Sequence, residues 1–506
     1  MHERRAPGCG STLMMAIAFL PLLRVRGGDS GGASVLATAA NIAADIVPAG
    51  MLPISMAVTL AMQSAPPMVA HPLVVALVAG FACVAQRTLV LIAEAVEQSG
   101  VTPPSLAEVW CSSPVLGGPR TVWLLDAAVL MLCSGCCLFY LCFIGDLLST
   151  AAAGMLPASG TKSAAPAQLE QLHSLLRRRS VHIVATASSV LLPLCLLRDL
   201  SMLAPFSAVG VLACVFCTGF ILWRSLDGSY KRGGRLDRAL IEEKAQRPRP
   251  AAAADTAASA SAEMRRAGLQ LLRRVFRRGH ASGQPEGPFA GLSAGRALPL
   301  INVISVAFVA HYNGAAYYEA LQERSVARFA TASAVALAGA AIVYSVAGVA
   351  GYACFGEAAD CVALNNYASR ADHVATAARL AMGVSLLASF PLMFAGLRTS
   401  ALALARAADV GTDTALASPA VHRVVVAVGL GAVTAAAVAT PDASLVVGLV
   451  GAALGSLFIY TLPPALHLLV GAAPVASVAG AVDVALCVLG LALAVLGTQG
   501  ALSTMA

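Results

Sequence analysis

The sequence predicts an all-α integral membrane protein with about eleven transmembrane helices. The chain of 506 residues is 58% hydrophobic and only 12% charged, with a mean hydropathy of +0.78, which excludes a soluble globular protein of this length. Its apolar residues also gather in long runs. A helix needs about 20 such residues to cross the hydrocarbon while pairing its backbone amides internally.

The first half of the chain holds five runs of this kind. A tail over residues 1–33 precedes them, and we interpret its short apolar run at 13–23 as part of that tail rather than as a signal segment. The expected helices occupy residues 34–62, 72–98, 121–150, 181–197 and 202–223, within a unit at 34–224.

The second half holds six more runs, within a unit at 298–498 that a short tail at 499–506 follows. The expected helices occupy residues 298–320, 329–354, 374–397, 421–440, 443–470 and 475–498. Lys and Arg in the short loops favour a cytoplasmic amino terminus.

Residues 225–297 form a basic, low-complexity loop between the two halves. Residues 225–296 contain fourteen Lys or Arg and seven Asp or Glu. The net charge of this stretch is therefore +7, which equals the net charge of the whole chain. Its Pro-Arg-Pro run and Ala-rich tract are typical of a linker that cannot bury a core. An amphipathic helix over residues 264–276 lying on an anionic membrane is the alternative; we favour the solvated linker.

Helix-breaking residues occur in the first run of each half. Pro48, Gly50 and Pro53 interrupt the first, and His-Tyr-Asn-Gly at 311–314 interrupts the sixth. Proline lacks a backbone donor, and glycine lowers the cost of irregular dihedrals. Unwound backbone inside a membrane is tolerated where it faces protein or a cavity, and it then offers carbonyls and helix ends to a ligand. The two breaks predict a binding site, with ordinary proline kinks as the alternative.

Short motifs follow one another in order between residues 34 and 470. They are Asn41 to Gly50, Gly145-Asp146, Leu192 to Leu194, Phe308 to Asn313 with Tyr318-Glu319, Tyr352 with Phe355-Gly356, Pro391 with Arg398, and Pro463 to Ala465. With these residues the chain resembles the amino acid/auxin permease family of transmembrane amino acid transporters, and within it the kinetoplastid amino acid permeases. Two residues differ from the family's usual ones. Pro48 stands where the family usually has the first Gly of its break, and His311 stands where the kinetoplastid members often have Gln.

The resemblance implies a leucine-transporter-like fold of two inverted five-helix repeats plus one helix, with helices one and six broken. Unwinding at Pro48 would leave free amides at the positive end of a half-helix, where a substrate carboxylate is stabilised. The sixth helix would offer carbonyls to the ammonium group. Tyr140 would cover the substrate backbone, unless it only packs. The predicted substrate-binding residues are Pro48, Ala49, Gly50, Met51, Tyr140, His311, Asn313 and Gly314.

Ion coupling is predicted to use Asn41, Asp45 and Ser389. Asp45 lies about one turn before the first break and could carry a proton, or join Asn41 in a sodium site; a structural hydrogen bond is the alternative. Ser389 matches a helix-eight hydroxyl that sodium-coupled relatives use, as the resemblance implies. We interpret the pair Arg87 and Glu94, and separately Asp126, as structural ion pairs or end-of-helix charges rather than as coupling groups.

The predicted function is secondary active transport of amino acids, driven by protons. Sodium coupling and a non-transporting amino acid sensor are the alternatives. The chain carries no His-Glu-x-x-His or Gly-x-Gly-Asp motif, and we expect no enzyme, and no cofactor or resident metal. Its expected partners are an amino acid, a proton or sodium ion, and the lipid bilayer, with no nucleic acid. We expect a multi-pass protein of the plasma membrane rather than of an organelle.

Overall fold

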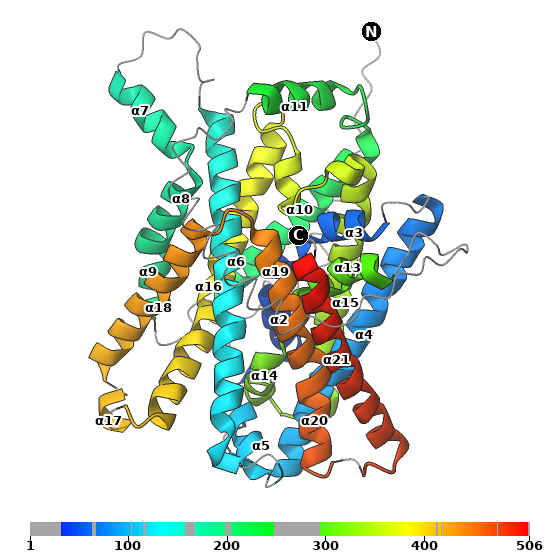
Figure 1. The fold of residues 1–506 in the computed structure, drawn as a ribbon, viewed down its shortest axis with the longest axis vertical. Helices are drawn as coiled ribbons and strands as arrows, with labels where there is room; N and C mark the ends of the chain where they lie inside the picture. The colour runs from blue at the N-terminus through cyan, green and yellow to red at the C-terminus, as the bar shows by residue number, and fades with distance from the viewer. Residues whose placement is uncertain are drawn as a thin grey trace.

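The protein is described from a computed structural model, which covers residues 32–62, 67–102, 104–113, 115, 118–156, 167–197, 204–246, 294–410, 413–416, 418–472 and 474–503. Within these ranges all regular structure is helical, apart from one isolated bridge between Ala33 and Leu321. The helices pack side by side into an elongated bundle (Figure 1). The all-α fold expected from the sequence is therefore confirmed.

Each of the eleven expected spans contains a membrane-length helix or a bent helix pair. In the first half these are α2 (Val35–Met51) with α3 (Ile54–Met62), α4 (Pro67–Ser99), α6 (Val122–Met155), α8 to α9 (Arg179–Leu196) and α10 (Ala204–Asp227). Shorter helices are α5 (Leu106–Ser112), η3 (Gly118–Arg120), α7 (Ala167–Leu176) and α11 (Arg235–Gln246).

The second half continues in the same way. Its spans are α13 (Ala294–Ala307) with η7 (His311–Asn313) and α14 (Gly314–Glu319), α15 (Val326–Phe355), α16 (His373–Ala407), α18 (Pro419–Ala439), α19 (Ala443–Leu449) to α20 (Leu462–Leu469) through two π-helical stretches, and α21 (Val478–Ser503). Shorter helices are η8 (Gly356–Ala358), η9 (Ala363–Asn366) and α17 (Asp413–Leu416).

Polar caps fix where several of these helices begin. The side chain of Ser34 accepts from the Ala37 amide at 3.2 Å, and that of Asp372 accepts from the Ala375 amide at 3.2 Å. Such caps satisfy backbone donors that the first turn of a helix leaves unpaired.

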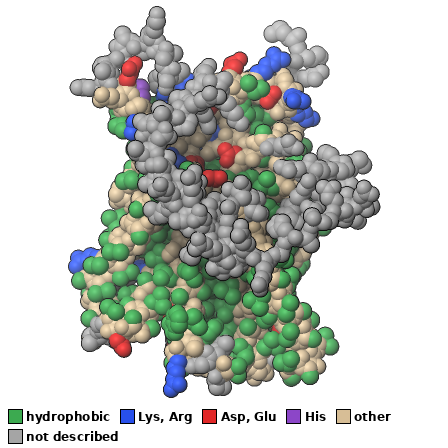
Figure 2. Space-filling view, viewed as in Figure 1, with side chains coloured by type: hydrophobic (Ala, Val, Ile, Leu, Met, Phe, Trp, Pro, Cys, Tyr) green, Lys and Arg blue, Asp and Glu red, His purple; other side chains and the backbone are tan. Residues whose placement is uncertain are grey.

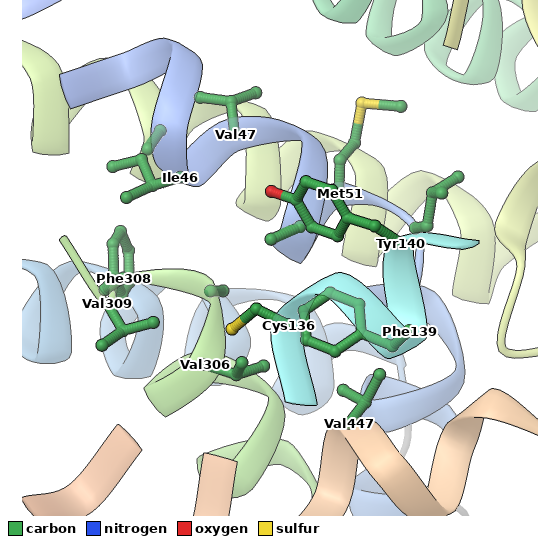
Figure 3. Close-up of a cluster of buried hydrophobic side chains, with 14 of the residues drawn as sticks. Ile46, Val47, Met51, Cys136, Phe139, Tyr140, Val306, Phe308, Val309 and Val447 are labelled. Carbon is green, nitrogen blue, oxygen red and sulfur yellow. The ribbon is translucent and has the colours of Figure 1, made fainter. Parts of the chain in front are cut away.

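The core lies where α6 runs alongside α16, with α2 and α10 packed against α16 and α15 packed against α2 and α10. Phe139, Tyr140 and Phe143 on α6 are fully buried there, and Figure 3 shows Tyr140 beside Met51 with its hydroxyl directed at α2. Where described residues are visible in Figure 2, hydrophobic side chains dominate the surface below the grey region, and charged ones lie mostly toward the two ends. This distribution suits a bilayer around the middle.

The segment predicted as a linker is helical in its first part, which corrects that prediction. Leu236 and Leu240, one turn apart on α11, are buried, and the Glu243 carboxylate accepts from the Ser369 amide at 2.8 Å. This short apolar stripe was hidden in the average composition of the loop. The helix considered as an alternative at 264–276 and the apolar run at 13–23 lie outside the described residues.

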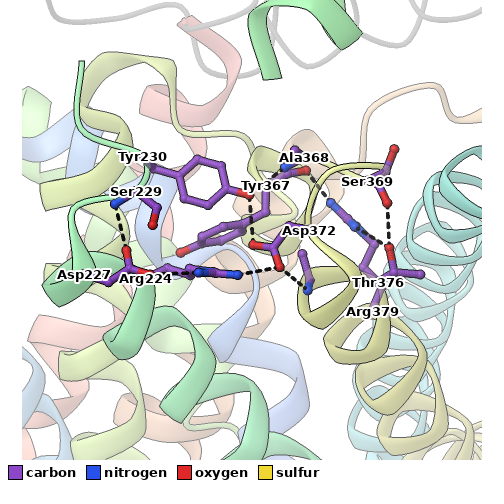
Figure 4. A network of polar contacts seen from close by, with 11 residues as sticks. Arg224, Asp227, Ser229, Tyr230, Tyr367, Ala368, Ser369, Asp372, Thr376 and Arg379 are labelled. Atoms are coloured by element: carbon purple, nitrogen blue, oxygen red, sulfur yellow. Dashed lines mark hydrogen bonds and ion pairs between the residues drawn. The ribbon is translucent and has the colours of Figure 1, made fainter. Parts of the chain in front are cut away.

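A polar network joins α10 to the start of α16 below α11 (Figure 4). Asp372 receives a hydrogen bond from Arg224 at 2.7 Å and one from the Tyr230 hydroxyl at 3.1 Å. Burial, and then the charge of Asp372, raise the pKa of the Tyr230 hydroxyl, so this group stays a donor. The network ties together the α11 end of the bundle.

Candidate substrate and ion site

Of the two interruptions expected in the first run, the structure has the one at Pro53 and not the one at Pro48 to Gly50. Helix α2 continues through Pro48 and Gly50 to Met51, and the 51° bend falls at Leu52 and Pro53. The expected unwinding at 48–50, with free amides at Ala49, Gly50 and Met51, is therefore wrong in position. Pro48 leaves the Ala44 carbonyl without its usual helical donor, and the Ser389 hydroxyl donates to this carbonyl at 2.8 Å. That replacement bond allows the helix to continue.

Gly50 allows a close approach between the two broken helices. A Cβ atom at Gly50 would lie 2.4 Å from the Cβ of Ala307 and 2.6 Å from the Cζ of Tyr344. The Tyr344 hydroxyl lies 2.8 Å from the Ile46 carbonyl and 2.9 Å from the Ala307 carbonyl. Tyr344 thus bridges α2 and the end of α13, a role that the sequence analysis missed.

The second break begins just before the predicted residues, at 308–310. Helix α13 ends at Ala307, and after an irregular stretch the chain resumes as η7 and α14. His311 is buried and faces α4, with its Nε2 2.9 Å from the Thr88 hydroxyl and 3.1 Å from the Ala85 carbonyl. Gly314 also lies against α4, because a Cβ there would meet Ile92 at 3.0 Å. Both residues therefore hold the break against α4.

Asp45 connects the two broken helices through its buried side chain. Its carboxylate accepts from the Tyr312 hydroxyl at 2.9 Å and from the Tyr317 hydroxyl at 2.8 Å. The Tyr140 hydroxyl donates to the Asp45 backbone carbonyl at 3.3 Å. We call Asp45, Tyr312, Tyr317 and Tyr140 the Asp45 cluster. Tyr312 and Tyr317 were not predicted as site residues, although they stand within and just after the motif at the second break.

No Lys, Arg or His in the described part of the chain forms an ion pair with Asp45. Its hydrogen-bond donors, the Tyr312 and Tyr317 hydroxyls and the Asn313 side chain, are neutral. A buried carboxylate without a cation is costly, so it is expected to bind a proton, a metal cation or a charged substrate.

The other predicted coupling residues also lie on or against α2. Ser389 on α16 is buried, and its hydroxyl contacts the carbonyl next to Asp45 in the chain. Asn41 is half-buried one turn before Asp45, so the two side chains share one face of the helix. Asn313, the remaining predicted substrate residue, is half-buried at the end of η7.

Backbone hydrogen bonds join the start of α2 to the end of α14. The Ala33 amide donates to the Ala320 carbonyl at 2.7 Å, and the Gln322 amide donates to the Ala33 carbonyl at 2.8 Å. Together with the Asp45 cluster, this bridge closes one end of the pair of broken helices.

Comparisons with known proteins agree with this architecture. The family described as "Transmembrane amino acid transporter protein" matches residues 31–242 and 280–503, which is most of the chain. The chain is also similar to a Danio rerio protein named "Putative sodium-coupled neutral amino acid transporter 11", with 32% identity over 96 residues. That match spans 19% of this chain and 21% of the length of the relative.

Proposed function

The chain belongs to the transmembrane amino acid transporter family, and we propose that it moves amino acids across a bilayer together with protons. The observation that carries the proposal is Asp45, a buried carboxylate without a cationic partner among the described residues, lying between the two broken helices. The substrate would bind between these helices, with Gly50, Tyr140 and Asn313 around it.

The proton is proposed to bind and leave Asp45 during each transport cycle. When Asp45 is ionised, its oxygens accept the hydroxyl protons of Tyr312 and Tyr317 and so hold α14 against α2. Protonation removes the charge that makes these hydrogen bonds strong. The end of the bundle closed by Ala33 and Leu321 then opens more readily, which links proton binding to alternating access.

Sodium coupling is the second candidate. The Ala44 carbonyl and the Ser389 hydroxyl lie 2.8 Å apart beside Asp45, and hard cations prefer such oxygen ligands. The name of the Danio rerio relative, a putative sodium-coupled transporter, also favours this candidate.

Ion substitution in proteoliposomes separates the candidates. With protons as the driving ion, uptake of labelled amino acids should rise with an inward proton gradient, collapse with a protonophore and continue when sodium is replaced by choline. Uptake that needs sodium and ignores pH would establish the second candidate. Binding of amino acids without accumulation under either gradient would identify a sensor rather than a transporter.

Substitution of Gly50 tests whether α2 contributes to the site. A Gly50→Val side chain would overlap Ala307 and Tyr344, and relieving such an overlap costs about 1–3 kcal/mol, so uptake should fall by roughly fivefold or more. Gly80→Val is the matched control, because nothing lies within 4 Å of a Cβ at that position. Normal uptake by a correctly inserted Gly50→Val protein would remove this part of α2 from the site.

A further inference from the structure

The connection between α15 and α16, residues 356–372, lies across the end of α2, and we call it the cover segment. The Ala363 amide donates to the Leu52 carbonyl, at the bend that follows α2, at 3.1 Å. The Thr59 hydroxyl on α3 donates to the Gly356 carbonyl at 2.8 Å. The cover segment is therefore bonded to both parts of the first broken span.

Both ends of α2 are closed by backbone hydrogen bonds. The bonds from Ala33 to Ala320 and Gln322 lie at its start, and the bond from Ala363 to Leu52 lies at its end. Helix α2 has 17 residues, so these closures stand about 25 Å apart at 1.5 Å per residue. Figure 1 shows α11 across one end of the bundle and α14 toward the other. Alternating access requires that each closure can be released in turn.

Helix α11 and the turn before it hold the cover segment from outside. The Glu243 carboxylate accepts from the Ser369 amide at 2.8 Å, from the Arg370 amide at 3.3 Å and from the Ser369 hydroxyl. The Tyr230 hydroxyl accepts from the Ala368 amide at 3.0 Å (Figure 4). Polar contacts thus fix the cover segment at both ends of α11.

The opposite side of the cover segment rests on α6. A Cβ atom at Gly154 would lie 2.4 Å from the Ser369 carbonyl oxygen, and the Arg370 Nε donates to the Ala153 carbonyl at 3.3 Å. The Asn365 side-chain amide lies 3.4 Å from the Asp146 carbonyl. The segment is therefore held between α6 on one side and α11 on the other.

The attachment of α11 to α10 has the features of a hinge. Gly228 has a φ of 69° and Gly233 a φ of 82°, a backbone conformation that glycine adopts at little cost. A few loop residues of this kind can absorb the rotation of a whole element. Leu236 and Leu240 are the buried apolar side chains of α11, so little apolar surface has to separate when this helix turns away.

We propose that α11 is a latch: Glu243 holds the cover segment across the end of α2, and rotation of α11 about Gly228 and Gly233 releases it. The carboxylate accepts from two backbone amides of the segment, and such charge-assisted bonds are strong. When α11 turns away, water replaces the carboxylate and the segment can lift from Leu52. The role of this opening in transport rests on the proposed function, whereas the latch itself does not.

Hydrogen exchange of the full-length wild-type protein tests whether α11 and the cover segment open together. Peptides covering residues 235–246 and 360–372 should gain deuterium at similar rates, because segments that open as one unit lose protection together. Both should exchange faster than the α6 peptide around the buried Phe139. Rapid exchange in α11 beside a cover segment that stays fully protected would overturn the latch.

Reaction of Cys361 with a membrane-impermeant maleimide tests Glu243 itself. Cys361 lies in the cover segment and is 5% exposed. Glu243→Ala should raise its reaction rate about tenfold, because hydrogen bonds to a charged group contribute at least that factor. Glu242→Ala, at the exposed neighbouring carboxylate, is the matched control and should react like the wild type. Mass spectrometry identifies the labelled cysteine.

An unchanged Cys361 rate in Glu243→Ala would overturn the assignment to Glu243. Additional labelling of Cys214, which is buried on α10, would mean that the variant has unfolded, and the exchange rates of the wild-type protein would then decide. Neither measurement depends on uptake. A protein that binds amino acids without moving them would contradict the proposed function and leave the latch in place.

Discussion

Two clusters of ionisable side chains in the described spanning helices differ in their charge balance. In the Asp45 cluster a carboxylate meets only neutral donors, two tyrosine hydroxyls and the Asn313 side chain. In the second cluster, His467 on α20 lies 2.7 Å from Asp483 on α21 and 3.1 Å from Glu94 on α4, and Glu94 also pairs with Arg87 at 2.8 Å. We call these four residues the His467 cluster.

The His467 cluster supplies its own counter-charges. Both ring nitrogens of His467 contact carboxylates, and ionised carboxylates only accept hydrogen bonds, so both nitrogens donate and the ring is an imidazolium. With Arg87 the four charges then sum to zero. The cluster joins α4, α20 and α21 and so fastens the peripheral α21 to the bundle. The contrast teaches that charge balance, rather than burial alone, separates a structural carboxylate from a coupling candidate.

The strongest test of this contrast is the Asp45→Asn variant. An amide keeps the shape of the side chain but cannot exchange a proton, so accumulation of substrate against its gradient should be lost and remaining exchange should not vary with pH. Uptake in proteoliposomes at several pH values measures both effects. Asp126→Asn, at another carboxylate on a spanning helix, is the control. Full pH-dependent accumulation by Asp45→Asn would return Asp45 to a structural role.

A smaller effect is expected when the Asp45 cluster loses one donor. In Tyr317→Phe the ionised form of Asp45 loses a hydrogen bond, so the proton binds more tightly and half-maximal uptake should move to higher pH. A hydrogen bond to a charged group contributes about 1.5–3 kcal/mol, which corresponds to roughly one to two pH units. Tyr352→Phe, which loses a bond to the Met62 carbonyl, should leave the pH profile in place. If the pH dependence of uptake by Tyr317→Phe were not shifted, the Asp45 cluster would not be the site of proton coupling.

The His467 cluster should respond in the opposite way. Asp483→Asn removes one charge from a balanced buried set and should lower the free energy of unfolding by about 3–5 kcal/mol, visible as earlier thermal unfolding in detergent. The pH dependence of uptake should remain. If stability were unchanged and the pH dependence disappeared, the coupling assignment would belong to this cluster.

The sequence was sufficient to predict the fold class, the spans and the family. Hydrocarbon thickness sets the length of an apolar run, so spans are readable from local composition, and both the family and the Arg87–Glu94 ion pair are confirmed. The relation between inverted repeats stays a prediction. Helix α11 was missed because two leucines one turn apart are invisible in the average of a long basic loop.

The site was predictable at the level of helices rather than atoms. Pro48 indicated a break, but the hydroxyl that lets the helix continue belongs to Ser389, far away in the chain. The partners of Asp45 and the bridging role of Tyr344 likewise depend on contacts between distant segments. Local sequence identifies a proline or a carboxylate, whereas its hydrogen-bond partner depends on tertiary packing.

The smallest effect is expected from the loop that follows α11. Deleting residues 247–287 removes neither cluster nor the Glu243 contact, so the KM for substrate should change by less than about threefold, which is about 0.6 kcal/mol. The basic, Pro- and Ala-rich composition of this stretch supports no packed core, which is why its removal should leave the bundle intact. The measurement is the uptake kinetics of the correctly inserted deletion variant. The Glu243→Gln variant, measured beside it, distinguishes an effect of the loop from an effect of the α11 contact. A large rise in KM for the deletion alone would mean that this segment covers the substrate path, and charge balance within the bundle would no longer suffice to locate the transport site.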